Sequence, residues 1–264
     1  MPRVFIDRLD DPRIEVYRQL KRSNLTRAGT QFVVEGEKLF DRLREGRFPI
    51  ASVLTTEQFE PRVAPRVPHG VPLYVVPDAL LSVTVGFNFH RGVLAAGYRR
   101  PWPAPLDHVR PDGERTTVVV CPTLNNPENL GAIVRISDVF GVDAILVGPR
   151  CPDPLSRRVL RVSMGTCLRL PVLVLDDLAA VVERLRDELG FELVATDLDP
   201  AAARFDAVER GDRLALFLGS EGTGLDAEWL RRATRRVTIP MRPGAESLNV
   251  AVAAGILLYH FARV

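Results

Sequence analysis

The sequence of 264 residues has few cysteines and no long apolar run, and each shortage excludes a class of protein. The three cysteines, Cys121, Cys151 and Cys167, are odd in number and widely spaced, which argues against a disulfide framework and against a zinc site. The longest apolar stretch, residues 250–259, is much shorter than the ~20 residues that a membrane-spanning helix needs. The first residues, MPRVFID, lack the apolar segment of a secretory signal peptide. We therefore expect a cytoplasmic protein with no membrane segment and no metal site.

The glycine fingerprint of nicotinamide-dinucleotide enzymes, G-x-G-x-x-G, is also absent, which disfavours that class. A different spacing, G-x-x-G-x-G, occurs at Gly219, Gly222 and Gly224, directly after a strand-like run. Glycines at the end of a strand let the backbone approach a ligand closely. A tight turn from strand to helix has the same pattern, so the spacing alone does not decide between a ligand site and a turn.

Lysine is nearly absent, since Lys21 and Lys38 are the only two, and arginine supplies almost all of the positive charge. Residues 1–106 contain 16 Lys and Arg against 11 Asp and Glu, a net charge of +5, whereas residues 107–264 contain 19 against 22, a net charge of −3. The first part is therefore the better candidate for contact with a polyanion. An ordinary solvated surface is the alternative interpretation.

A proline-rich segment, residues 99–113, indicates a linker between two domains, 1–106 and 107–264. The first domain begins with a run of helical spacing over 12–22 and contains a second helix near 38–45. Its strand-like runs are 31–35, 52–55, 73–76 and 92–97. This pattern predicts a small α/β module.

Strand-like and helical runs alternate regularly after the linker. The strand-like runs are 117–121, 144–147, 171–175, 191–196, 214–218 and 237–240. The helical runs are 127–140 with Asn126 as cap, 155–162, one capped by Asp176 or Asp177 and ending at Gly190, one capped by Asp226, and 247–261. The alternation predicts an α/β fold in which helices cover both faces of a parallel sheet.

Three segments of the second domain carry the residues best suited to chemistry. The first, residues 126–142, reads NPENLGAIVRISDVFGV, and the second, residues 214–225, reads LALFLGSEGTGL. The third, residues 239–256, reads IPMRPGAESLNVAVAAGI. Ser247 is predicted to cap the last helix, whose positive end suits a ligand with acceptor groups.

Asn129 and Arg135 of the first segment are six residues apart, about 240° around a helix, so they do not share a face. We therefore expect Asn129 to shape the start of the helix and Arg135 to project towards a substrate. A surface arginine on an amphipathic helix is the alternative for Arg135. Asp197 and Asp199, after the strand-like run that ends at Thr196, suit either a ribose or a turn.

In this order, the three segments closely resemble the three motifs of the SpoU family of RNA ribose methyltransferases, within the SPOUT superfamily. The resemblance covers about residues 115–264. It implies a bound S-adenosylmethionine whose methyl group goes to a ribose 2′-hydroxyl of RNA. It also implies a SPOUT methyltransferase domain with a C-terminal trefoil knot, and a homodimer.

The resemblance assigns the site residues as well. The positions implied for cofactor binding are Gly219, Ile239, Leu248, Thr196, Leu218 and Met241. The positions implied for catalysis are Asn129, Arg135, Glu221 and Asn249, with Ser247 in support. The family proposal makes the motif arginine the base, but a guanidinium with a pKa above ~12 is a reluctant base. We expect Arg135 to stabilise the developing alkoxide and to grip a neighbouring phosphate.

The first domain resembles the ribosomal-protein-like substrate-binding domain that is fused to many of these enzymes. The residues that carry this shorter resemblance are FVVEGEKL, 32–39, and RGVLA, 91–95. It favours 23S-type ribosomal RNA as the substrate over transfer RNA. The alternatives are a tRNA 2′-O-ribose methyltransferase and a non-catalytic RNA-binding or ribosome-assembly protein with the same fold.

Overall fold

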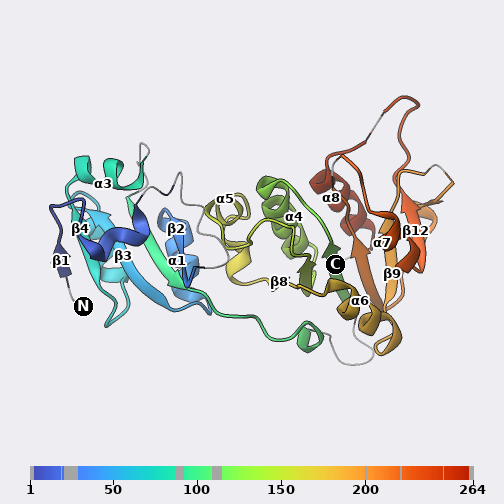
Figure 1. The fold of residues 1–264 in the computed structure, drawn as a ribbon, viewed down its shortest axis with the longest axis horizontal. Helices are drawn as coiled ribbons and strands as arrows, with labels where there is room; N and C mark the ends of the chain where they lie inside the picture. Colours follow the sequence, from blue (N-terminus) through green and yellow to red (C-terminus); the bar gives the residue numbers. More distant parts are fainter. Residues whose placement is uncertain are drawn as a thin grey trace. The chain divides into compact units, whose positions relative to one another are not determined.

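The computed structural model divides the chain into two compact units (Figure 1). The structure describes residues 3–18, 20, 29–86, 92–108, 115–199, 201–220, 222–245 and 247–261. The first unit contains Met1–Pro101 together with Leu155–Arg169, and the second contains Trp102–Pro154 together with Leu170–Val264.

The first unit is built on a mixed five-stranded sheet with the order β1-β4-β3-β5-β2. These strands are β1 (Arg3–Phe5), β4 (Leu73–Val76), β3 (Ile50–Thr56), β5 (Val93–Tyr98) and β2 (Gln31–Glu35). β4 runs parallel to both β1 and β3, whereas β5 is antiparallel to β3 and β2. The predicted α/β module is confirmed, and the sheet places the carboxyl ends of β3 and β4 side by side.

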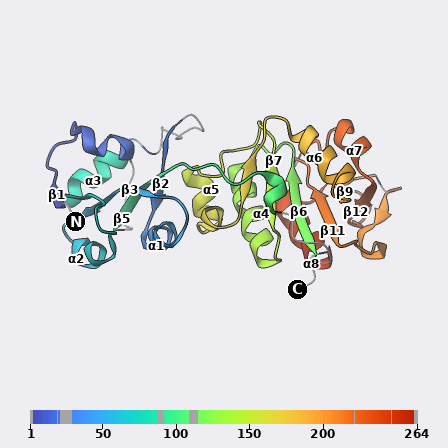
Figure 2. The same cartoon turned by 90° about the horizontal axis from the view of Figure 1, so that it is seen from below.

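Helices lie on both faces of this first sheet (Figure 2). They are α1 (Glu37–Glu45), α2 (Glu60–Val63) and α3 (Asp78–Val85), with short 3-10 helices at Pro12–Tyr17 and Ala64–Arg66. The helical run expected over 12–22 is a 3-10 helix ending at Tyr17, because the Tyr17 ring turns into the core and its hydroxyl donates to the Ser52 carbonyl oxygen at 2.9 Å. Complete burial raises the pKa of Tyr17, so this hydroxyl stays a donor.

The segment Leu155–Arg169 packs with the first unit, although it lies between strands of the second sheet in the sequence. It holds α5 (Arg157–Val162) and a 3-10 helix at Thr166–Leu168. Arg157 lies 3.5 Å from the buried carboxylate of Glu35, and Arg42 donates to the Met164 carbonyl oxygen. The sequence-based division at residue 106 assigned this segment to the second domain, since its helical pattern continues the alternation there.

The second unit contains a sheet of seven strands in the order β10-β12-β9-β11-β6-β7-β8, and every pair in it is parallel. The strands are β6 (Thr116–Cys121), β7 (Ala144–Val147), β8 (Val172–Val174), β9 (Glu192–Thr196), β10 (Ala203–Arg204), β11 (Arg213–Phe217) and β12 (Arg235–Thr238). The predicted parallel α/β fold is confirmed. β10, only two residues long, was not predicted.

Figure 2 shows α6 and α7 on one side of this sheet and α4 and α8 on the other. These helices are α4 (Pro127–Val139), α6 (Leu178–Asp187), α7 (Ala227–Arg232) and α8 (Val250–Phe261), and 3-10 helices lie at Pro105–His108 and Phe205–Ala207. The caps predicted at Asn126 and Asp177 are confirmed, since their side chains accept from the backbone N–H groups of Glu128 and Ala180. Both faces of the sheet are therefore covered, as a parallel sheet requires.

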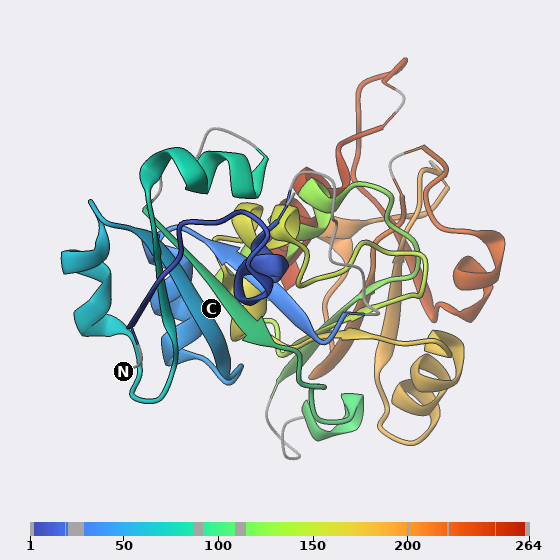
Figure 3. The ribbon, with the colours of Figure 1, turned by 60° about the vertical axis from the view of Figure 1, so that its left-hand side comes forward.

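The expected linker over 99–113 is partly a packed segment. Trp102 and Leu106 pack against the core cluster that α6 and α7 cover. Residues 239–245 and 247–249, between β12 and α8, belong to a loop that extends from the second sheet (orange-red in Figures 1 and 3). None of the helices in the described part of the chain is long and apolar enough to cross a membrane.

Arg210 joins the end of α8 to the strands of the second sheet. Its Nη1 donates to the Phe261 carbonyl oxygen at 3.1 Å and to Thr117 Oγ1 at 2.7 Å. Its Nη2 donates to the carbonyl oxygens of Thr116 and Asp212 at 3.1 and 2.8 Å. Burial lowers the pKa of this guanidinium, and the positive charge of Arg115 lowers it further. The Phe261 carbonyl is one of the four that a helix leaves without an internal partner, so Arg210 caps α8 from outside.

We expect Arg210→Ala to lower the free energy of unfolding of the second unit by about 2–4 kcal/mol, because hydrogen bonds from a charged donor are lost together. Both tryptophans, Trp102 and Trp229, belong to the second unit, so urea unfolding followed by tryptophan fluorescence reports on it. Arg231→Ala is the matched control, since Arg231 is exposed. Equal losses in the two variants would contradict the role of Arg210.

Candidate functional site

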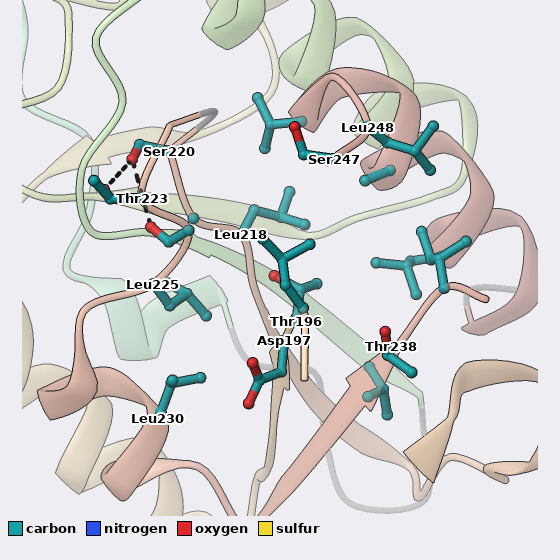
Figure 4. A pocket seen from close by; sticks show the side chains of 18 of the residues that line it. Thr196, Asp197, Leu218, Ser220, Thr223, Leu225, Leu230, Thr238, Ser247 and Leu248 are labelled. Carbon is teal, nitrogen blue, oxygen red and sulfur yellow. Dashed lines mark hydrogen bonds between the residues drawn. The ribbon is translucent and has the colours of Figure 1, made fainter. Parts of the chain in front are cut away.

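Three neighbouring parallel strands of the second sheet end at the same edge. β12, β9 and β11 are adjacent, so the last residue of β9, Thr196, lies near Leu218 after β11 and Ile239 after β12. Polar groups and free backbone gather where parallel strands end, and this is the usual ligand site of open α/β sheets. The start of α8 closes the same edge (Figure 4).

A cavity of about 220 Å³ lies among these strand ends (Figure 4). The structure brings together at this cavity all of the positions predicted for cofactor binding: Gly219, Ile239, Leu248, Thr196, Leu218 and Met241. Ser247, predicted to support catalysis, lines it as well. Their roles stay predictions, but the residues form one continuous surface.

A stripe of α8 that sequence reasoning missed forms one wall of the cavity. Val250, Ala253 and Leu257 are spaced at i, i+3 and i+7, so they lie on one face of the helix, and all three line the cavity. Leu198, 53% exposed, lines it from the segment after β9. The signal was present in the sequence, because the helical spacing counted from Val250 selects these residues.

The loop between β11 and α7 forms a tight hairpin. The backbone N–H groups of Ser220 and Gly224 each donate to the other's carbonyl oxygen at 3.0 Å, and Ser220 Oγ lies 2.9 Å from Thr223 Oγ1. A Cβ added at Gly219 would lie 2.2 Å from the Gly224 carbonyl carbon. Glycine is therefore required at Gly219 by the loop's own backbone, in addition to the ligand approach that the sequence suggested. Glu221, predicted to act in catalysis, lies outside the described residues.

Asp197 and Asp199 combine the two roles that the sequence left open. Asp197 lines the cavity, and its Oδ1 also accepts from the Asp199 N–H at 3.1 Å. The Asp199 side chain accepts from the Ala201 N–H at 2.9 Å and does not line the cavity. Asp197 is thus a ligand-facing residue held by a turn, and Asp199 is a turn residue.

The predicted cap of the last helix was wrong by two residues. α8 begins at Val250, and Asn249 Oδ1 accepts from the N–H groups of Ala251 at 2.9 Å and Val252 at 3.3 Å. Ser247 is exposed and stands before the first turn, where it lines the cavity (Figure 4). Asparagine caps as well as serine does, and the residue next to the first turn takes the position.

Asn249 also joins α8 to α4. Its Nδ2 donates to Asn129 Oδ1 at 3.1 Å, and Asn129 is only 6% exposed. The Nδ2 atom of Asn129 is buried and has no hydrogen-bond partner among the described residues. The structure therefore brings together two of the predicted catalytic residues, beside the cavity, and leaves one buried donor available.

Arg135 stands apart from this group. Its side chain is exposed on α4, does not line the cavity, and makes no hydrogen bond or ion pair with the described part of the chain. Asn129 points inward and Arg135 outward, as their spacing predicted. Arg135 is therefore free to contact something outside its own chain.

The arrangement has the properties of a small-molecule site. Its walls are mostly apolar, and its polar side chains are those of Thr196, Asp197, Ser220, Thr223, Thr238 and Ser247. Within the ranges that the structure describes, no three His, Cys, Asp or Glu side chains gather as metal ligands would. The cavity suits a partly apolar ligand with hydroxyl or amino groups.

Comparison with known sequences finds one matching family. Residues 116–259, more than half of the chain, match the SpoU rRNA Methylase family. The chain is 36% identical to an uncharacterized tRNA/rRNA methyltransferase of Mycobacterium tuberculosis over 262 residues, covering 96% of this chain and 90% of the relative. It is 28% identical to the 23S rRNA (guanosine(2553)-2′-O)-methyltransferase RlmP of Bacillus subtilis, covering 87% of each chain.

Solved structures agree with this match. The AdoMet-bound rRNA methyltransferase from Sinorhizobium meliloti superposes with a TM-score of 0.84 at 26% identity, covering 99% of this chain and 97% of that one. The likeness therefore extends over both units of the chain, and the solved relative holds S-adenosylmethionine.

We expect Asn249→Ala to lower the free energy of unfolding by about 1–3 kcal/mol, because α8 loses its cap and Asn129 Oδ1 loses its donor. Asn249→Asp should lose less, since it keeps the capping acceptor and the unpartnered Nδ2 of Asn129 can turn to donate to it. Tryptophan fluorescence in urea measures both variants. If both variants lose the same free energy of unfolding, the separate contributions assigned to the cap and to the link to Asn129 are contradicted.

Proposed function

The chain belongs to the SpoU rRNA methylase family, and we propose that it transfers the methyl group of S-adenosylmethionine to a ribose 2′-hydroxyl of ribosomal RNA. The cavity at the ends of β9, β11 and β12 is the observation that carries the proposal, because every position expected to bind the cofactor lines it. The relative named as a 23S rRNA 2′-O-methyltransferase supports ribose as the acceptor. The reaction belongs in the cytoplasm, where cysteines stay reduced.

The residues of the cavity fit S-adenosylmethionine. Leu198, Ile239 and Leu248 offer apolar surface to an adenine ring, and the Asp197 carboxylate and Thr196 hydroxyl suit ribose hydroxyls or an amino group. The backbone at Gly219 supplies further hydrogen-bonding groups. When bound, the cofactor supplies a methyl sulfonium, an activated electrophile. The chain's task is then to hold the ribose hydroxyl in line and to manage its proton.

Asn129 and Asn249 orient the reacting groups in this proposal. The buried, unpartnered Nδ2 of Asn129 donates to substrate or to a cofactor oxygen, and Asn249 holds Asn129 in place through the 3.1 Å hydrogen bond. Ser247 faces the cavity and supports the same region. Glu221 completes the set through its place in the loop after β11.

Arg135 stabilises the developing alkoxide and grips an adjacent phosphate. A guanidinium stays protonated at neutral pH, so it serves as a charge and a planar fork rather than as a base. The hydroxyl proton leaves through the phosphate or through water.

An exposed apolar surface on α4 and α8 supports a homodimer. The dimer face, as we call it, consists of Val139, Val252 and Tyr259, which are 65%, 52% and 73% exposed. Val252 and Tyr259 are seven residues apart on α8, and Tyr259 packs edge-on against Phe140 at 6.2 Å, so the two helices share this face. A second copy of the chain covers it in the proposal, since identical patches meet across a twofold axis.

Arg135 lies four residues before Val139, on the same side of α4 as the dimer face. Because Arg135 does not line the cavity of its own chain, we infer that it acts at the cavity of the partner subunit. Each site then takes its cofactor pocket from one chain and its arginine from the other.

The family's trefoil knot also belongs to this proposal. β12 lies beyond β9, yet α8 packs against α4 and its end is tied by Arg210 to the start of β6. The loop 239–249 must cross the ends of the intervening strands to make this return. That path supports a threaded C-terminal segment.

The first unit is proposed to grip the RNA, with domains 1–106 and 107–264 as the functional division. The net charge of +5 over residues 1–106 and the resemblance of this part to a fused substrate-binding module favour structured ribosomal RNA over transfer RNA. A non-catalytic RNA-binding protein is the alternative from another class. The intact Arg135 and Asn249 argue against it.

We expect Arg135→Ala to bind S-adenosylmethionine normally and to lower methyl transfer by about 10²-fold or more, the scale of a lost charge-stabilising group. Ala253→Phe should block cofactor binding, because Ala253 lines the cavity from α8. Single-turnover transfer of labelled methyl to 23S rRNA and calorimetry measure the two effects. Near-normal transfer by Arg135→Ala would show that Arg135 is only a surface residue.

Mixing these two inactive variants tests whether the arginine acts across the dimer. After denaturation and refolding together, a mixed dimer has one cofactor site opposite an intact Arg135, and random pairing should restore about a quarter of wild-type activity. No recovery would place Arg135 and the cofactor in the same subunit.

The dimer face itself gives a separate prediction. Light scattering should report about twice 29.3 kDa for the wild type and about 29.3 kDa for Val252→Arg, because a charge cannot be buried there without a partner. Val83→Arg, an equally exposed valine on α3, is the control. A dimer that survives Val252→Arg would contradict the assignment of the face.

A further inference from the structure

A second cavity, of about 450 Å³, lies wholly within the first unit and has no part in the proposed chemistry. It opens where the parallel strands β3 and β4 end, since Thr56 pairs with Val76 at the last position of each strand. Its lining comes from Thr56, Gln58 and Phe59 after β3, from Asp78 and Ser82 of α3, and from Gly92 before β5. Such an edge of a parallel sheet is where ligands bind in other α/β folds.

An aromatic ring is fixed at one wall. A Cβ added at Gly92 would lie 2.5 Å from Phe59 Cδ1, so the ring packs directly on the Gly92 backbone. Gly92 has a φ of +74°, and Thr55 Oγ1 donates to its carbonyl oxygen at 2.6 Å, which holds this backbone in place. Phe59 is half-buried and lines the cavity, so it offers a rigid apolar wall for a flat ligand.

A buried hydroxyl at the same cavity lacks a partner. Thr56 is only 3% exposed, and its Oγ1 makes no hydrogen bond within the described residues. A buried hydroxyl without a hydrogen-bond partner is destabilising, so a ligand group that bonds to it would be stabilised. No side chain caps α3, because Pro77 stands at the cap position. The N–H groups of Leu80 and Leu81 donate to the Pro77 carbonyl oxygen, so the N–H groups of Asp78 and Ala79 are the ones left for a ligand.

The charge at the cavity selects the kind of ligand. Asp78 begins α3 and is exposed at the cavity, where its carboxylate repels phosphate and accepts N–H donors. Two parallel N–H donors on one flat ring, next to a carbonyl acceptor, are the Watson–Crick edge of guanine. The carboxylate accepts hydrogen bonds from the two N–H donors. The hydroxyls and the unpaired first-turn amides donate to the carbonyl oxygen of the base.

We propose that this cavity holds one unpaired guanine base of the RNA substrate. Unpaired bases are recognised by contact with an aromatic ring and by hydrogen bonds to their Watson–Crick edge, and both are provided here. The inference rests on the proposed action on RNA. It assigns to the first unit a base-specific contact in addition to a general grip on phosphates.

The test uses the full chain and four fluorescein-labelled RNA heptamers, UUUGUUU, UUUAUUU, UUUCUUU and UUUUUUU. Wild-type protein should bind UUUGUUU at least about fivefold more tightly than the other three, the lower end of what a bidentate base contact provides. Asp78→Ala should abolish this ratio, and Phe59→Leu should reduce it. Fluorescence anisotropy at one fixed salt concentration measures all of them.

Glu57→Ala is the charge-matched control, because Glu57 is exposed beside the cavity but does not line it. It removes one negative charge as Asp78→Ala does, so it should raise affinity for every heptamer and leave the guanine ratio unchanged. Equal wild-type affinity for the four RNAs, or a ratio that survives Asp78→Ala, would overturn the proposal.

Methyl transfer and cofactor binding are measured on the same preparations. If the wild-type protein transfers the methyl group but shows no preference for guanine, only the cavity assignment is wrong. A wild-type protein that prefers guanine but transfers no methyl group to rRNA sinks only the proposed function.

Discussion

The pairing of β11 between β9 and β6 is the constraint on which the second unit depends. β11 (Arg213–Phe217) pairs in parallel with β6, almost a hundred residues earlier in the sequence, and with β9, so it joins the two halves of the sheet. This insertion places the Gly219 loop at the middle of the sheet edge, beside the ends of β9 and β12. Arg210, three residues before β11, ties the end of α8 to the same strands. A slip of β11 by one residue would reverse its faces and remove both the cavity and this link.

The sequence predicted this sheet well because a buried parallel strand has a strong local signature. The apolar runs, the Asn126 and Asp177 caps and the three motif segments are all local features, and the structure brings the positions predicted for cofactor binding to one edge as a consequence of topology. What failed depended on non-local contacts. The segment Leu155–Arg169 has the helical pattern of the second unit, but the pairing of Arg157 with Glu35 and of Arg42 with the Met164 carbonyl belongs to the first. The cap of α8 moved from Ser247 to Asn249, because both residues cap well and only the packing of α8 on α4 chooses the start of the helix.

The site divides into a part that one chain completes and a part that it does not. The cavity, its apolar wall from α8 and the Asn129–Asn249 hydrogen bond are formed within one chain. The sequence was enough to select Arg135 as a candidate, but not to predict where it acts. In a single chain the residue is exposed and lies away from the cavity. In the proposed dimer, the charge of Arg135 reaches a site only when two copies meet, so activity would depend on assembly. The proposal also accounts for the place of Arg135 and the apolar Val139 on one side of α4, because the same face would be buried when the charge acts.

The two cavities sit at equivalent places in two different sheets, at the carboxyl ends of parallel strands, and this suggests how recognition is shared. The reacting group alone does not distinguish one nucleotide from another, because every nucleotide carries the same 2′-hydroxyl. Selectivity must then come from contacts elsewhere on the RNA. When the RNA is also bound at a second point, the effective concentration of the target ribose at the methyl-transfer site rises, without any new contact at that site. A guanine held at Asp78 and Phe59 would provide such a point, so the first unit would select the RNA and the second would act on whichever ribose that selection brings within reach.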